Sequence, residues 1–140
     1  RIEAAILDNG TDMDQSMTPY QAGLGAFIDM DKEYFVGKKA LIHADKRTLL
    51  YGLKSKGAAP AMGDEVLEGA AVVGSVTAGA VSPYLSCGIG YVRFKTAGDW
   101  AGKNLMIKSA DAISHHCEIV ELPFYDKEKK IPRGIDRTIP

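Results

Sequence analysis

The sequence predicts an α+β fold dominated by antiparallel β-structure, in which a short α/β segment precedes a small antiparallel β-barrel. After Thr48 the chain divides into short β-branched or aromatic segments, with turn signals roughly every 8 to 15 residues. Before that point the apolar residues recur at mixed helical and extended spacing. This change of pattern places a boundary near Lys46, so we expect two parts, residues 1–45 and 46–140.

The first part is expected to hold short elements. Residues 1–7, RIEAAIL, read as a helix or a strand. Thr18 is expected to cap a short helix with Pro19 at its first position. The following residues, 24–30, fit either a helix or the end of a strand. Residues 37–45 predict a short amphipathic helix.

The second part predicts the strands of the barrel, because short β-branched runs alternate with Gly- and Pro-rich turns. Residues 57–66, GAAPAMGDEV, are assigned to a turn. The glycines of this part suit bulges and tight corners, and they are Gly69, Gly74, Gly79, Gly88 and Gly90. The expected strands lie within residues 49–55, 71–82, 88–94, 105–109 and 115–125.

Composition restricts the function classes. The 140 residues are 46 % hydrophobic and 25 % charged, with a net charge of −1, so electrostatics favours neither nucleic acid nor an anionic membrane as a partner. No apolar run approaches the roughly 20 residues that span a bilayer. Two cysteines are too few for a disulfide framework, which predicts a reducing, cytoplasmic location. Because the chain opens inside an apolar run without a methionine, we expect it to be the C-terminal piece of a longer protein.

The acidic stretch DNGTDMD, residues 8–14, is dense in oxygen ligands but does not have the spacing of a calcium loop. With Asp8 at position 1, Gly10 takes position 3 and Pro19 takes position 12, where calcium loops need ligands. We expect a turn instead, with Asn9-Gly10 supplying a corner of positive φ and the aspartates bonding local amides.

No catalytic or metal-binding constellation emerges from the other motifs. His115, His116 and Cys117 are adjacent and point to alternate faces of a strand, so we interpret them as an edge-strand histidine pair beside a buried thiol. Cys87 has no basic neighbour in sequence to activate it. The glycine pair at positions 88 and 90 lacks the third glycine and the helix of a dinucleotide loop.

The order of the segments is more informative. These segments are RIEA (1–4), NGTDMD (9–14), TP with AGL (18–24), FVGKKAL (35–41) and VTAGAVSP (76–83). In this order the chain resembles, over residues 1 to about 126, the C-terminal part of the glycine cleavage T protein family of tetrahydrofolate-dependent aminomethyltransferases.

The resemblance implies that residues 1–45 end a folate-binding region and that residues 46–140 form a barrel closing one side of the folate cavity. In the family the catalytic aspartate, the pterin-binding glutamate and a folate-proximal arginine lie upstream of Arg1, so we assign no catalytic residue here. Tyr125 is expected to stack on the aminobenzoyl group of tetrahydrofolate, and Lys129 and Arg133 to pair with its glutamate carboxylates. The implied partners are folate, a small one-carbon donor and a lipoyl carrier protein.

Two departures from the family pattern leave alternatives open. The acidic loop lacks the usual tyrosine-glycine-asparagine sequence, and the tail after Tyr125 is longer, as in oxidative demethylases of the dimethylglycine or sarcosine type. A non-catalytic binding or structural module is the other alternative. In each case we expect the isolated chain to be inactive, and we expect the charged tail of residues 126–140 to lie on the surface.

Overall fold

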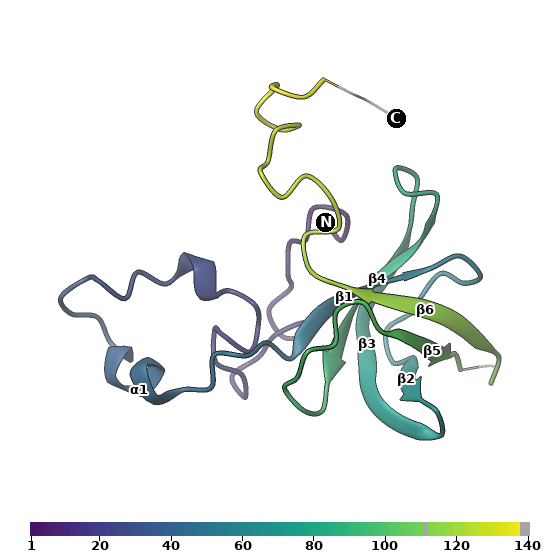
Figure 1. Cartoon of the computed structure of the whole chain (residues 1–140), viewed down its shortest axis with the longest axis horizontal. Coiled ribbons are helices and arrows are strands. Elements are labelled where there is room, and N and C mark those ends of the chain that lie inside the picture. Colours follow the sequence, from purple (N-terminus) through teal and green to yellow (C-terminus); the bar gives the residue numbers. More distant parts are fainter. Residues whose placement is uncertain (111, 138–140) are drawn as a thin grey trace.

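The computed structural model describes residues 1–110 and 112–137. Within them six antiparallel strands close into a barrel in the order β1-β4-β3-β2-β5-β6 (Figure 1). The predicted small antiparallel barrel is therefore confirmed. The strands are β1 (Leu50–Ser55), β2 (Glu65–Glu68), β3 (Ala71–Ser82), β4 (Cys87–Phe94), β5 (Asn104–Lys108) and β6 (Ser114–Val120).

Most predicted strands lie where the β-branched runs placed them, but β2 falls inside and just after the stretch assigned to a turn. Only four residues long, it carries a glutamate at each end and has a single fully buried side chain, Val66. Such a short strand shows almost no alternation of apolar and polar residues by which the sequence could predict it. Its place in the barrel is fixed by hydrogen bonding to β3 and β5.

The first part of the chain is largely irregular. Residues 1–7 form turns, so the prediction of a helix or strand there is wrong. The short helix predicted after Thr18 is absent, because residues 19–23 form a turn. Thr18 does cap this turn: the Gln21 amide donates to Thr18 Oγ1 (3.2 Å) and the Thr18 amide to Gln21 Oε1 (2.9 Å). The turn ends at Gly23, whose φ of +74° is left-handed.

An arm of residues 25–47 extends away from the barrel (Figure 1). It carries a 3₁₀ turn, η1 (Gly25–Phe27), and the helix α1 (Lys38–His43), which lies within the predicted range. Neither is long and apolar enough to cross a membrane, and the described residues hold no other helix. The arm exposes several large apolar side chains, namely Phe27, Tyr34, Val36 and Ile42.

The interior of the barrel is an apolar core. Alternate residues of each strand point inward, and burial of this kind supplies the main stabilising free energy of a small domain. Trp100, from the loop before β5, stacks on Phe94 with ring centroids 4.1 Å apart. The inner core comprises Tyr51, Leu53, Val66, Val76, Val92, Phe94, Trp100, Leu105, Ile107, Cys117 and Ile119.

A second core lies on the outer face of β1, β3 and β4. Ile89 and Tyr91 point outward there and are nonetheless fully buried. The N-terminal segment and the chain after β6 cover them, with Phe124 stacked parallel to Tyr91. Gly52 permits this approach, because a Cβ at that position would lie 2.8 Å from the Phe124 ring. The barrel therefore has one buried outer face.

The loop of residues 57–61 packs closely over the ends of β3 and β4. A Cβ on Gly79 would lie 1.8 Å from the Pro60 carbonyl oxygen, and one on Gly88 would lie 1.9 Å from that of Ala58. The expectation that these two glycines form bulges or corners is therefore wrong, since they make room for a crossing loop. Gly69 does form a corner, with φ of +63° between β2 and β3.

Candidate functional site

A cavity of about 360 Å³ lies where three parts of the chain meet. The N-terminal segment and the start of the arm form one side, β1 forms the floor, and the chain after β6 forms the other side. Most of the lining is apolar, with one cation and one carboxylate. The lining residues are Ala4, Ala5, Leu7, Ala22, Gly23, Leu24, Phe27, Thr48, Leu50, Tyr51, Glu121, Leu122, Pro123 and Lys129.

Two lining residues from opposite ends of the chain have unusual backbone conformations. Ala5 has φ of +56° and Lys129 has φ of +55°, a region that residues other than glycine rarely occupy. The Lys129 ammonium donates to the Ala4 carbonyl at 3.4 Å, which joins the two sides of the cavity. Such conformations concentrate at binding sites, where surrounding contacts hold them.

The charges at the rim are partly balanced. Glu121 forms an ion pair with Lys127 at 2.8 Å. The hydrogen bond from Lys127 lowers the pKa of the Glu121 carboxyl. Because Lys127 offsets that carboxylate, Lys129 remains the cation that can meet an anionic group in the cavity.

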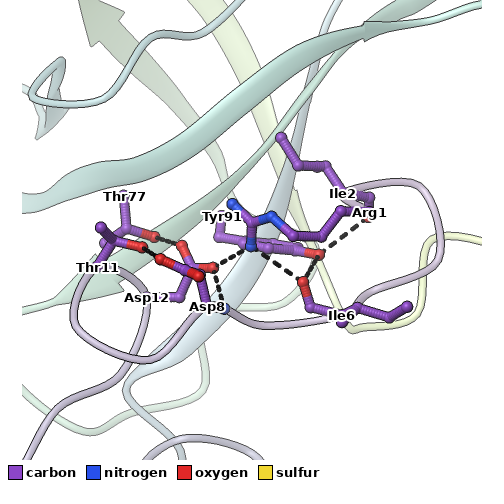
Figure 2. Close-up of polar contacts among 8 residues, drawn as sticks. All are labelled: Arg1, Ile2, Ile6, Asp8, Thr11, Asp12, Thr77 and Tyr91. Atoms are coloured by element: carbon purple, nitrogen blue, oxygen red, sulfur yellow. Dashed lines mark hydrogen bonds and ion pairs between the residues drawn. The ribbon is translucent and has the colours of Figure 1, made fainter.

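Asp12 anchors the N-terminal wall of the cavity. Its side chain is fully buried and accepts hydrogen bonds from Arg1 Nη1 (2.6 Å), the Asp8 amide (2.8 Å) and Thr77 Oγ1 (2.6 Å) (Figure 2). Thr77 lies at a register shift of β3 between Val76 and Ala78. A bulge of this kind redirects a side chain, and here Thr77 meets the segment covering the outer face.

Arg1 and Tyr91 complete the same network. The Tyr91 hydroxyl donates to the Ile2 carbonyl at 3.0 Å, and Arg1 Nη1 also donates to the Ile6 carbonyl at 3.0 Å (Figure 2). The hydrogen bond to Asp12 raises the pKa of the Arg1 guanidinium, and burial raises the pKa of Tyr91 to about 12. Both groups keep their protons at neutral pH. Together they hold the N-terminal wall on the barrel.

The acidic stretch forms the predicted turn and has a further role that the sequence did not reveal. Gly10 has the expected positive φ, +107°, and Asp14 accepts from the Ser16 amide at 2.8 Å. The burial of Asp12 depends on Thr77, 65 residues away, so no local signal indicated it. Across the described ranges, no three His, Cys, Asp or Glu side chains are arranged to hold a metal ion.

The strand β6 is not an edge strand of the barrel, because it pairs with both β1 and β5. The histidine pair lies at its start, where β6 pairs with β5 alone, because the pairing with β1 covers only Glu118–Val120. The thiol expectation is confirmed: Cys117 faces the inner core, and burial raises its pKa to about 11.

The structure separates the three residues expected to bind folate. Lys129 lines the cavity. The ring of Tyr125 stacks instead on Tyr84, with centroids 4.3 Å apart, and Arg133 is exposed in the tail. A role for each toward folate stays a prediction. The last three residues of the predicted surface tail, 138–140, lie outside the described residues.

Sequence comparison identifies relatives for nearly the whole chain. An aminomethyltransferase of Halothermothrix orenii is 36 % identical over 130 residues, covering 89 % of this chain and 36 % of the relative. One of Streptomyces coelicolor is 34 % identical over 137 residues, covering 92 % and 37 %. The chain therefore spans little more than a third of the length of these relatives.

The fold has a solved counterpart. The glycine cleavage system aminomethyltransferase T of Bartonella henselae superposes with a TM-score of 0.75 at 22 % identity, over 91 % of this chain and 37 % of that one. Residues 48–126 match the family of the glycine cleavage T-protein C-terminal barrel domain. The match covers more than half of the chain and includes every strand of the barrel described above. The chain belongs to the glycine cleavage T-protein family, of which it represents the C-terminal part.

Proposed function

We propose that the chain is the C-terminal part of a tetrahydrofolate-dependent aminomethyltransferase and that the cavity of about 360 Å³ forms one side of its folate site. The observation that carries the proposal is the composition of that cavity. A mostly apolar lining suits the flat rings of folate, and one lysine at the rim suits its terminal carboxylates. The relatives named aminomethyltransferase support the reaction class.

The exposed arm supports the same proposal. Phe27 and Val36 are 85 % and 90 % exposed, and Tyr34 and Ile42 add further apolar surface. Several large apolar side chains exposed on one short segment are typical of a surface that another part of a protein covers. In the proposed enzyme, the portion of the transferase that the relatives carry beyond this match would cover the arm and enclose the folate from the other side.

In the proposed enzyme, the residues of this chain would bind tetrahydrofolate and hold it in position for the one-carbon transfer. Lys129 would attract the glutamate carboxylates. The Asp12 network would keep Ala4, Ala5 and Leu7 in place against the rings. Apolar walls would also exclude water from the reactive one-carbon unit.

The test is folate affinity in the intact protein, measured by fluorescence or calorimetry. Lys129→Ala should weaken tetrahydrofolate binding by about 3- to 10-fold, the effect expected of one partly exposed charge-assisted contact. It should leave unchanged the affinity of a pteroate analogue that has no glutamate. Lys130→Ala is the matched control, since Lys130 lies in the same tail but pairs with Glu128. Equal affinities for wild type and Lys129→Ala would contradict the proposal.

The same measurement with Tyr125→Ala and Arg133→Ala tests the other two predicted contacts. Because the Tyr125 ring stacks on Tyr84, we expect its removal to loosen the tail and to weaken binding indirectly. Turnover with an aminomethylated lipoyl carrier, compared with turnover of dimethylglycine, distinguishes the transferase from the oxidative demethylase alternative. A protein that binds no folate at all would instead favour the non-catalytic module.

A further inference from the structure

A larger cavity, of about 610 Å³, lies elsewhere on the barrel. It is a groove between the tip of the β3–β4 hairpin and β6, over the end of β1, and it shares no lining residue with the first cavity. Leu85 and Cys87 form one side, and His116 and Glu118 form the other. Nothing in the proposed folate site uses this groove.

The groove is lined by two lysines and one carboxylate, together with side chains that can both donate and accept hydrogen bonds. Lys54 and Lys56 line it, and neither forms an ion pair within residues 1–110 and 112–137. Glu118 is the opposing carboxylate and is the cross-strand neighbour of Lys54, yet the two are not ion-paired in that part of the chain. His115, His116, Ser86, Ser114 and Asn104 supply further hydrogen-bonding groups.

We propose that this groove binds a small anionic molecule through a phosphate or carboxylate group, with Lys54 and Lys56 as its charge partners. Ammonium groups hold oxyanions by charge-assisted hydrogen bonds, and the walls of a groove reduce the competition from water. Leu85, on the hairpin side, offers apolar contact to the remainder of the molecule. The cavity has room for a ligand larger than the anionic group itself.

Cys87 provides a reporter for this site, because it lines the groove and is partly exposed. The other cysteine, Cys117, also borders the groove, but its side chain is buried and its pKa is raised to about 11, so it should not react at pH 8. The experiment measures alkylation of Cys87 in the intact protein by anionic iodoacetate and by neutral iodoacetamide. Inorganic phosphate and citrate are the competing probes, and sodium chloride at equal ionic strength corrects for screening.

We expect phosphate or citrate to slow the iodoacetate reaction at least about threefold beyond sodium chloride, because the anion occupies the cationic groove. The stronger of the two probes identifies the preferred anionic group. In the double variant Lys54→Gln/Lys56→Gln this protection should disappear, and the ratio of iodoacetate to iodoacetamide rates should fall about threefold.

The matched control is Lys39→Gln/Lys95→Gln, which removes the same charge from exposed positions outside the groove. In this control, phosphate or citrate should protect Cys87 as in the wild type, and the ratio of iodoacetate to iodoacetamide rates should be unchanged. Circular dichroism verifies that both double variants are folded. The proposal is overturned if neither probe protects Cys87 beyond sodium chloride, or if protection persists in Lys54→Gln/Lys56→Gln. Folate binding is not measured in this experiment, so its outcome is independent of the proposed transferase function.

Discussion

Replacing Asp12 by alanine should destabilise the protein by about 2–4 kcal/mol, because hydrogen bonds to a buried charged group contribute about 1.5–3 kcal/mol each. The carboxylate has three donors, but they do not count equally. The Arg1 side chain is 39 % exposed, so solvent screens its ion pair, and such pairs contribute about 0–1 kcal/mol. Most of the lost stability comes from the Thr77 hydroxyl and the Asp8 amide, because both lose their hydrogen-bond acceptor. Water that partly enters the site can replace that acceptor, which reduces the total loss of stability.

Urea unfolding followed by circular dichroism measures this free energy. Asp31→Ala is the matched control, since that aspartate is exposed, and it should change stability by no more than about 0.5 kcal/mol. A double-mutant cycle with Thr77→Val isolates the contact across the chain and should give a coupling of about 1–2 kcal/mol. If Asp12→Ala resembles the control, or if the coupling is zero, the assignment of Asp12 as the anchor is refuted.

Asp14, Gly79 and Gly52 each make a close contact whose loss can be measured. The pKa of Asp14 is lowered to about 2, first by its hydrogen bond from Ser16 and then by Arg93, so its stabilising effect is present above the ordinary value near 3.8 and is lost as the pH falls through 2. The gap in urea midpoint between wild type and Asp14→Asn should therefore shrink from pH 5 to pH 2, and a constant gap would contradict this. Gly79→Ala should cost more than about 2 kcal/mol by displacing the 57–61 loop, whereas Gly57→Ala should be mild; similar unfolding midpoints would refute the close approach. Gly52→Ala should push Phe124 outward and speed proteolysis of the tail, and an unchanged cleavage rate would exclude that contact.

The sequence by itself determined the class of fold and the family. Long β-branched runs such as residues 71–82 indicate strands because their side chains suit a pleated, half-buried surface, and β3 has those bounds. The Thr18 cap and the positive φ of Gly10 were also predictable, because both are local effects of a few neighbouring residues. The ordered motifs identified the family, and the comparisons confirm it.

Only the tertiary structure decided which of these residues matter to the site. Asp12 is buried because Thr77 reaches it across 65 residues, and Gly79 is required because a distant loop crosses it. Segments far apart in the chain also meet where β6 pairs with β1 and β5. The same is true where Lys129 lies beside Ala4. Periodicity and propensity describe how a residue relates to its near neighbours. Cavities, buried anchoring residues and close backbone contacts form where distant segments pack together. Local sequence patterns do not indicate which distant segments will pack.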